Sequence, residues 1–330
     1  MADFVRAVLR RDRVGKEDPL VLERAALPPL AAGQVRLKVR ACGVCRTDLH
    51  IVSGELPARR DAVVPGHQIV GEIVEGGRAG ERVGVSWMGS TDGTCRFCRT
   101  GAENLCDEPR FTGYDLDGGY AEYADARADF VHPLPEGLDD LHAAPLLCAG
   151  VIGFRALRVA GVERGERVGL YGYGASAHLM LSVLQSWGCE VYVATRGEGR
   201  RALARQMGAA WTGDARDQPP QRLDRAVTFA PAGEVVVAAL GALRKGGVVA
   251  VNAIHLDCIP RFDYDSLLWG ERQIRSVANM TRGDARDFLR LAAEIGLRPH
   301  ARAWPLEQAN QALAALAADE IAGAAVLVPG

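Results

Sequence analysis

The sequence predicts an α/β protein with two domains, an irregular β-barrel and a doubly wound parallel sheet. At 330 residues the chain is longer than a single hydrophobic core usually supports. Short β segments broken by glycine and proline fill the first part of the chain, and strands alternate with helices after residue 150. We therefore expect residues 1–150 and 288–330 to form the barrel domain and residues 151–287 to form the sheet domain.

The barrel domain contains three expected strands, and in the first of them apolar and polar residues alternate, as they do in a half-buried strand. These segments are residues 34–41, 69–75 and 82–87, and prolines separate them from their surroundings. Their irregular spacing is typical of a barrel and not of repeated strand–helix–strand units.

The sheet domain begins with a strand, a glycine turn and an apolar helix that reaches Trp187. Strands and helices then alternate, as a parallel sheet requires. The strands are expected at 166–171, 190–195, 225–230 and 247–252, and the further helices at 200–207 and 234–243. The tail adds an amphipathic helix at 306–317 and a strand at 323–328 without a matching helix, so we expect the tail to return to the first domain.

Charge and cysteine usage narrow the functional classes. The net charge of −2 provides no general attraction for nucleic acid or an anionic membrane. The N-terminal segment lacks a signal-peptide core, and no apolar run reaches the ~20 residues of a membrane span, so we expect a cytoplasmic protein without a membrane partner. Disulfides are rare in that compartment, so the clustered cysteines of the first third indicate a metal or catalysis. They are Cys42, Cys45, Cys95, Cys98 and Cys106.

Three short segments each offer one zinc ligand. They are G-V-C-R-T-D-L-H with Cys45, P-G-H-Q-I-V-G with His67, and P-L-L-C-A-G with Cys148. Two thiolates and one imidazole leave one tetrahedral position open, which is the arrangement of a catalytic zinc. Taken singly, Cys148 is also typical of a buried apolar residue and His67 of a hydrogen-bonded structural histidine.

The segment R-V-G-L-Y-G-Y-G-A-S-A-H has the features of a dinucleotide-binding turn. A predicted strand leads into G-x-G-x-x-A, at Gly172, Gly174 and Ala177, and an apolar helix follows. Glycines allow backbone amides at a helix N-terminus to approach a pyrophosphate closely. We expect Gly172, Gly174, Ala175 and Ser176 to contact the cofactor.

The end of the second strand of this domain bears on the choice of cofactor. An acidic residue there would bind the ribose 2′-hydroxyl of NAD, but the chain has Thr195 followed by Arg196. A hydroxyl and a cation suit a 2′-phosphate, so NADP is favoured over NAD. The alternative is that these arginines belong to a solvated helix start.

Through these segments, and through A-G-E-R-V-G-V and G-G-Y-A-E-Y, the sequence resembles the medium-chain zinc-dependent alcohol dehydrogenases, especially their bacterial branch. The resemblance spans essentially the whole chain. It implies a GroES-like barrel, a Rossmann domain, catalysis in the cleft between them, and hydride transfer between an alcohol and its aldehyde or ketone with NAD(P). It also implies a homodimer or homotetramer, and it leaves the physiological substrate and the favoured direction open.

The resemblance assigns roles to further residues. It makes Cys45, His67 and Cys148 the zinc ligands, with Asp48 orienting the histidine. Thr47 and His50 match a proton relay. Arg46 and Arg282 match contacts to the cofactor pyrophosphate, and Leu56 and Trp87 match positions that line the substrate channel. A bulky indole at residue 87 would favour small or unbranched substrates; the structural alternative is that Trp87 packs the core.

One residue departs from the family pattern. The residue after the ligand histidine is usually glutamate, and here it is Gln68. A neutral amide cannot serve as an exchanging anionic ligand, and the lost negative charge should make zinc a slightly stronger Lewis acid. A Gln68→Glu variant with an unchanged pKa for bound alcohol would refute that hypothesis.

A second cysteine group has the spacing D-x₂-C-x₂-C-x₇-C, formed by Asp92, Cys95, Cys98 and Cys106. The family's structural zinc lobe has four cysteines at this spacing, so Asp92 stands in place of the first. Aspartate oxygen is an acceptable zinc ligand, and a second zinc is therefore favoured over a metal-free lobe with three reduced thiols. No basic helix accompanies the cysteines, which argues against a nucleic-acid zinc finger.

Two other functions remain open from the sequence. One is a zinc-free quinone or enoyl reductase on the same fold, against which the three retained ligands argue. The other is a non-catalytic binding relative, against which the relay residues argue. The remaining cysteines, Cys42, Cys189 and Cys258, are expected to be buried apolar residues, and the other histidines structural.

Overall fold

The computed structural model describes residues 3–330, which pack as two units. The first unit is the chain up to Cys148 together with Met280–Gly330, and the second is Ala149–Asn279. The sequence placed the second boundary at residue 287, within the helix α8 (Arg282–Glu294). All of α8 belongs to the first unit, where it packs against β10 (Val131–Pro133), and this contact moves the boundary to the start of the helix.

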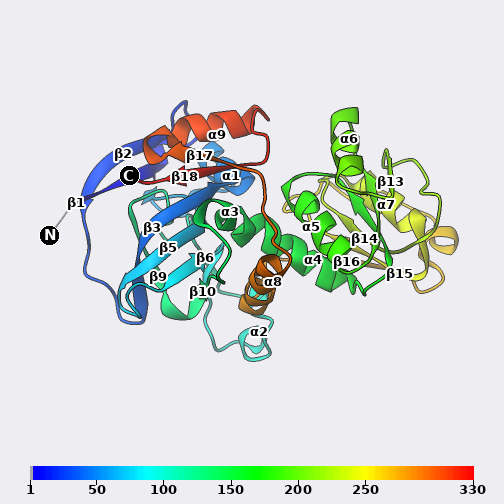
Figure 1. The fold of residues 1–330 in the computed structure, drawn as a ribbon, viewed down its shortest axis with the longest axis horizontal. Coiled ribbons are helices and arrows are strands. Elements are labelled where there is room, and N and C mark those ends of the chain that lie inside the picture. The colour runs from blue at the N-terminus through cyan, green and yellow to red at the C-terminus, as the bar shows by residue number, and fades with distance from the viewer. Residues whose placement is uncertain (1–2) are drawn as a thin grey trace. The chain divides into compact units, whose positions relative to one another are not determined.

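The first unit is built from mostly antiparallel sheets, and the strands at the centre of its largest sheet are buried over most of their length (Figure 1). Its largest sheet has the order β10-β6-β5-β3-β18-β17, with β9 also paired to β3, and a smaller sheet has the order β2-β1-β4. The predicted strands at 34–41, 69–75 and 82–87 correspond to β3, β5 and β6. The strands are β1 (Asp3–Arg10), β2 (Leu20–Ala26), β3 (Gln34–Val44), β4 (Ala62–Val63), β5 (Gln68–Glu75), β6 (Arg82–Val85), β7 (Met88–Ser90), β8 (Arg110–Phe111), β9 (Tyr123–Arg127), β17 (Ala301–Pro305) and β18 (Ala324–Val328).

The C-terminal segment returns to the first unit, as expected. Strand β18 pairs antiparallel with β3, and β17 pairs parallel with β18, so the end of the chain lies beside strands from its beginning (Figure 1). The helix expected at 306–317 begins with a short 3₁₀ turn and continues as α9 (Ala309–Ala317). Its buried face, with Ala312 and Leu313, joins the core of the barrel.

The second unit is a parallel sheet of six strands in the order β13-β12-β11-β14-β15-β16. Strand order reverses on either side of β11, which is the arrangement of a doubly wound sheet. Helices follow the strands as the sequence predicted. The elements are α4 (Val151–Ala160), β11 (Arg167–Tyr171), α5 (Ala175–Ser186), β12 (Glu190–Ala194), α6 (Glu198–Gln206), β13 (Trp211–Gly213), β14 (Leu223–Thr228), α7 (Gly233–Ala242), β15 (Leu243–Val251) and β16 (Gln273–Ser276).

One helical run departs from the sequence expectation. Helix α3 (Asp140–Pro145), the π-helical segment Leu146–Gly150 and α4 are continuous, and the resulting stretch Asp140–Ala160 is long and apolar enough to span a membrane. However, 67% of its most apolar window is buried inside the protein, as in a core helix.

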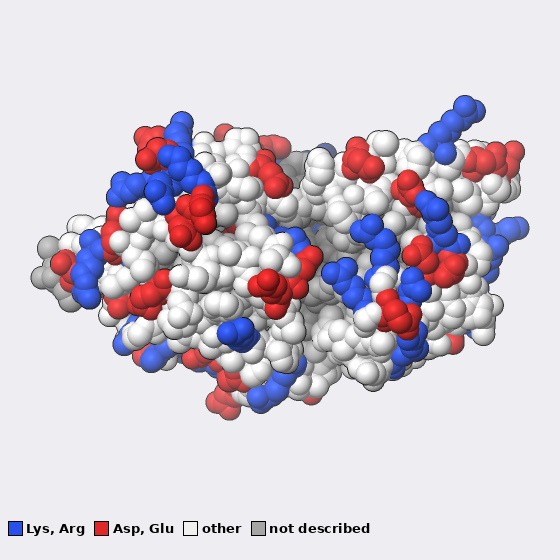
Figure 2. All heavy atoms as spheres, turned by 90° about the horizontal axis from the view of Figure 1, so that it is seen from above, with Lys and Arg blue, Asp and Glu red and all other residues white. Residues whose placement is uncertain are grey.

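On the face drawn in Figure 2, basic side chains are interleaved with acidic ones.

Candidate active site

The three predicted zinc ligands converge in the first unit. Cys45 immediately precedes α1 (Arg46–Ser53), His67 immediately precedes β5, and Cys148 lies in the π-helical segment. Their ligand atoms all lie within 4.8 Å of one another, and Cys45 Sγ is 3.4 Å from His67 Nε2. His67 is fully buried, whereas both cysteines are half-buried. Three segments far apart in the sequence therefore present one compact donor set.

Asp48 organises this donor set from behind. As the third residue of α1 it completes a capping box with Cys45, whose backbone N–H donates to Asp48 Oδ2 at 2.9 Å. Oδ1 of Asp48 accepts from the Gly66 N–H at 3.2 Å and lies 3.2 Å from His67 Nδ1. The carboxylate thus engages Nδ1 and leaves Nε2 directed at Cys45. Orientation of a ligand imidazole by a carboxylate is a common feature of zinc sites.

The charges in the cluster suit a cation. The pKa of Cys45 is held well below its usual range by the hydrogen bond between Cys45 and Cys148 and by the nearby His67, although burial raises it. Burial lowers the pKa of His67, but Asp48 and Cys45 outweigh it and raise that pKa to about 10. The hydrogen bond to Cys45, together with burial, raises the pKa of Cys148 well above its usual value. A half-buried thiolate and a buried carboxylate thus face one buried imidazole.

Two glycines allow the ligand segments to approach one another. Gly66 has φ +94°, and a Cβ there would lie 2.3 Å from the ring of Tyr120 and 2.8 Å from Cys42 Sγ. A Cβ on Gly43 would lie 2.7 Å from the side-chain oxygen of Gln68, which is buried at the start of β5. Tyr120 was not singled out in the sequence. Its fully buried ring packs against Gly66, the residue before the ligand His67. Its only signal was membership of the G-G-Y-A-E-Y segment.

The predicted relay residues lie on α1. Thr47 is buried and its backbone N–H donates to Cys45 Sγ at 3.3 Å. His50, one turn further on, is partly exposed, and its Nδ1 lies 2.6 Å from the carboxylate of Glu55. Arg46, the first residue of the helix, forms an ion pair with Asp319 at the surface. The helix therefore links the donor set to a histidine near solvent.

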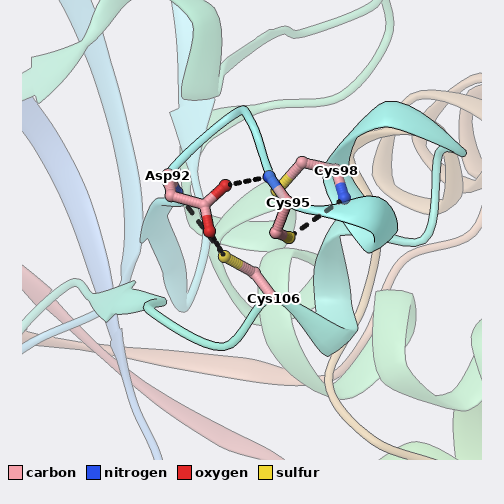
Figure 3. A group of neighbouring side chains, drawn as sticks. All are labelled: Asp92, Cys95, Cys98 and Cys106. Carbon is pink, nitrogen blue, oxygen red and sulfur yellow. Dashed lines mark hydrogen bonds between the residues drawn. The ribbon is translucent and has the colours of Figure 1, made fainter.

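The second predicted metal site is also assembled (Figure 3). Ligand atoms of Asp92, Cys95, Cys98 and Cys106 all lie within 4.8 Å of one another. Asp92 Oδ1 accepts backbone N–H groups of Thr94 and Cys95 at 2.6 and 2.8 Å, and its Oδ2 accepts from Cys106 Sγ at 3.2 Å. Cys95 caps the short helix α2 (Arg96–Arg99) by accepting the Cys98 N–H at 3.4 Å.

Local hydrogen bonds favour anionic donors in this lobe. The backbone N–H groups of Cys95 and Thr94 lower the pKa of Asp92, and the Cys98 N–H lowers the pKa of Cys95. Desolvation raises the pKa of Cys106 to about 12, so that thiol holds its proton and donates it to Asp92. Three thiols and one carboxylate form a donor set compatible with zinc.

The predicted cofactor turn has the expected local geometry. Gly172 follows β11 with φ +92°, and a Cβ there would lie 3.0 Å from the backbone nitrogen of Ala230. Gly174 precedes α5, and a Cβ there would meet nothing within 4 Å. Ala175 and Ser176 form the first turn of this helix, and their N–H groups are among those without an intrahelical acceptor. The turn thus offers backbone donors to an anion.

The residues expected to distinguish the cofactors follow β12. Thr195 is buried and its N–H donates to the carbonyl of Gly213 at 2.9 Å. Arg196 is exposed. Arg201, from α6, donates to the Thr195 carbonyl at 2.9 Å and lies 3.6 Å from Asp214. Arg201 is therefore tied to neighbouring groups.

Arg282, the other arginine matched to the pyrophosphate, is engaged within the first unit. It begins α8, and its Nε lies 3.3 Å from the buried carboxylate of Glu103. It also lies 3.5 Å from Asp129 and 4.6 Å from the centroid of Phe130. A phosphate would have to share this guanidinium with two carboxylates.

Trp87, the predicted channel residue, contacts the ligand histidine. Its ring meets that of His67 edge-on at a centroid distance of 5.1 Å and stacks on Phe111 at 4.8 Å. Leu56, in the loop after α1, packs against the barrel core. The indole packs against the barrel core, in agreement with the structural alternative, and it also borders the donor set; its place in a substrate channel stays a prediction.

The expectation for the remaining cysteines is correct for two of three. Cys42 and Cys189 are buried, but Cys258 is exposed. The expectation rested on the lack of partners at metal-ligand spacing, but residues 252–263 form a loop without helix or strand, and Cys258 is exposed there.

Comparison with known families gives two matches along the chain. Residues 31–136 match the alcohol dehydrogenase GroES-like domain, and residues 177–294 match the zinc-binding dehydrogenase family. The first match contains Cys45, His67 and the cysteine lobe.

Individual proteins are similar over nearly the full length. A probable alcohol dehydrogenase AdhA of Mycobacterium tuberculosis (strain CDC 1551 / Oshkosh) is 48% identical, over 96% of this chain and 95% of its own. An alcohol dehydrogenase of Geobacillus stearothermophilus is 34% identical, over 94% of this chain and 96% of its own. Among solved structures, a cinnamyl alcohol dehydrogenase from Sorghum bicolor (L.) Moench is 26% identical and superimposes with a TM-score of 0.87, covering 99% of this chain and 98% of its own.

Proposed function

We propose that Cys45, His67 and Cys148 hold the catalytic zinc of this chain, which belongs to the medium-chain zinc-type alcohol dehydrogenases. The chain is an NAD(P)-dependent oxidoreductase of alcohols and their aldehydes or ketones. The observation that carries this assignment is the convergence of these three donors with Asp48 on the far nitrogen of the imidazole.

The donor set fits zinc in chemistry and in spacing. Zinc–sulfur bonds of ~2.3 Å and zinc–nitrogen bonds of ~2.0 Å at tetrahedral angles put the two donor atoms roughly 3.5 Å apart. Cys45 Sγ and His67 Nε2 are 3.4 Å apart. A zinc held by these three donors would have a further position free for a substrate oxygen.

The residues around the metal divide the chemistry between them. When bound, zinc would supply Lewis acidity at the substrate oxygen and nicotinamide would accept or return the hydride. Oxidation of an alcohol also releases a proton, and we assign its path to Thr47 and His50. Thr47 lies next to the donor set, and Glu55 orients the partly exposed His50, from which the proton would reach solvent.

Removal of one ligand tests the assignment. A Cys148→Ala variant is expected to lose one zinc per chain and the alcohol-dependent absorbance change at 340 nm, because two donors cannot retain the metal. Cys189→Ala, a buried cysteine of the other unit, is the matched control and should keep both. Full turnover by Cys148→Ala would instead favour a zinc-free reductase.

We also propose that Asp92, Cys95, Cys98 and Cys106 hold a second, structural zinc. Their spacing and the lowered pKa values of Asp92 and Cys95 support this. The wild-type protein should contain two zinc ions per chain. Asp92→Cys should keep both zinc ions, and Cys95→Ala should keep one zinc ion and its turnover. A wild-type protein with only one zinc ion per chain would show that the lobe is metal-free.

For the cofactor, we propose contacts from Gly172, Gly174, Ala175 and Ser176 to the pyrophosphate. Thr195 and Arg196 support NADP over NAD, because the strand end carries a hydroxyl and an exposed cation but no carboxylate. The test is kcat/KM with each cofactor, for the wild type and Arg196→Ala. NADP should be preferred, and Arg196→Ala should reduce that preference. The resemblance also suggests Arg46 and Arg282, which would first have to exchange their present partners.

Substrate size, assembly and location are the remaining proposals. Leu56 and Trp87 would line the substrate pocket, where the indole against His67 favours small or unbranched alcohols. A homodimer or homotetramer and a cytoplasmic location are both proposed from the family. Mass measurement in solution and a panel of alcohols test the first two directly.

A further inference from the structure

A series of aromatic rings leads from the surface to the ligand histidine. Trp87 meets His67 edge-on and lies nearly parallel to two rings, Phe111 at 4.8 Å and 12° and Tyr114 at 6.1 Å and 20°. The guanidinium carbon of Arg59 lies over the Tyr114 ring, 4.8 Å from its centroid. Tyr114 therefore contacts both the indole beside the donor set and a cation near solvent.

Tyr114 also connects Trp87 to the loop that carries Leu56. The phenol donates a hydrogen bond to the carbonyl of Pro57 at 2.6 Å, and Tyr114 is only 5% exposed. The backbone N–H of Leu56 in turn donates to the carbonyl of His50 at 2.9 Å. One side chain thus connects the two residues proposed to line the substrate pocket.

Arg59 is fixed in its position over the tyrosine ring. Its Nη1 lies 3.0 and 3.3 Å from the two carboxylate oxygens of Asp115. Asp115 also accepts the backbone N–H of Phe111 at 2.9 Å, so the carboxylate is itself anchored to the ring series. An arginine held over an aromatic face by a carboxylate makes a stable cation–π contact.

We propose that Tyr114, held by Arg59, is a positioning residue that fixes the Trp87 indole and so limits the size of substrate that the pocket accepts. The inference rests on the proposed function, because it takes Trp87 to border the substrate. Tyr114 acts on the substrate through the position of the Trp87 indole, and not through its hydrogen bond to Pro57. When the ring or the cation is removed, the indole gains room to tilt, and branched alcohols should benefit more than straight-chain ones.

The test compares two alcohols with the same number of carbon atoms, butan-1-ol and 2-methylpropan-1-ol. The quantity measured is the ratio of their kcat/KM values, branched over straight. In Arg59→Met and Tyr114→Leu this ratio should rise about fivefold or more, within the range that one misplaced methyl group produces in an apolar pocket. The change should appear mainly in KM for the branched alcohol, with zinc content unchanged.

Two variants separate ring stacking from other effects. Tyr114→Phe keeps the ring and loses only the hydrogen bond to Pro57. Arg60→Met removes the adjacent arginine, which pairs with Asp117 at 2.7 Å and, within residues 3–330, lies over no aromatic ring. In both variants the ratio should stay within twofold of the wild-type value. If a general loosening of the loop caused the effect, these two variants would shift the ratio as well.

The inference is wrong if Arg59→Met and Tyr114→Leu leave the ratio unchanged, or if Arg60→Met shifts it equally. Arg59 has a side chain 52% exposed, so its variant should fold even where Tyr114→Leu does not. A wild-type protein that holds zinc but oxidises no alcohol of the panel, and reduces no aldehyde or ketone, would overturn the proposed function itself, and this inference with it.

Discussion

At the scale of single residues, Asp48 has more contacts with the donor set than any sequence pattern suggested. It accepts hydrogen bonds from the backbone of Cys45 and Gly66 and engages His67. One buried carboxylate therefore caps a helix, fixes a loop and orients an imidazole. Its removal should affect metal binding before it affects the fold as a whole.

The corresponding prediction concerns Asp48→Asn. Because an amide cannot accept all three hydrogen bonds, the affinity for zinc should fall about 10- to 100-fold, as measured by competition with a chelator. Asp284→Asn is the matched control, since Asp284 completes the other capping box, with Thr281 at the start of α8, and is not among the metal donors. Equal zinc affinity in both variants would show that Asp48 does not orient the ligand.

Gly66 gives a second prediction at this scale. Gly66→Ala combines a left-handed backbone with a contact of 2.3 Å to Tyr120, whereas Gly101→Ala at φ +76° meets nothing within 4 Å. Gly101→Ala should cost about 1–2 kcal/mol of unfolding free energy, and Gly66→Ala roughly 1–3 kcal/mol more, because overpacking adds to strain. Denaturant unfolding measures both. Similar losses would mean that the Tyr120 ring gives way easily.

At the scale of elements, the sequence predicted those whose pattern is regular. Strand β3 was found because apolar and polar residues alternate over residues 34–41. The run from α3 to α4 was missed because its residues are apolar on all sides and include Pro145, so no helical period is visible. The start of β15 was placed four residues late because Lys245 and Gly247 resemble a turn, although Leu243 already pairs with Leu223.

Contact between β10 and α8 yields a prediction about pH. His132 on β10 is buried, and desolvation, with the charges of Arg282 and Arg286, lowers its pKa to about 4 from 6.5. A histidine that stays neutral in the fold contributes stability in full above its unfolded pKa, and this contribution is lost as the pH falls from about 6.5 to 4. The total loss is ~3 kcal/mol.

His132→Leu removes that titration. Its unfolding free energy should therefore decline less than that of the wild type between pH 7 and pH 4, as measured by urea unfolding at a series of pH values. Parallel declines in the two proteins would show that His132 is protonated in the folded state at its ordinary pKa.

At the scale of the whole molecule, the sequence predicted which residues form the donor set but not how the chain assembles it. Taken alone, each donor could equally be a structural residue. Only the fold brings Cys148, about 100 residues further along the chain, close to Cys45. The resemblance supplied this pairing in advance. The partners of Arg46 and Arg282 could not be predicted, because Asp319 and Glu103 lie in distant segments without a pattern that links them.

The most direct test of the account is zinc K-edge absorption on a Cys95→Ala, Cys98→Ala double variant, which removes two donors of the second site. A single zinc with two sulfur ligands at ~2.3 Å, one imidazole nitrogen at ~2.0 Å and one further light ligand is the predicted result. A protein that retains no zinc, or a zinc with another ligand set, would contradict the assignment of Cys45, His67 and Cys148.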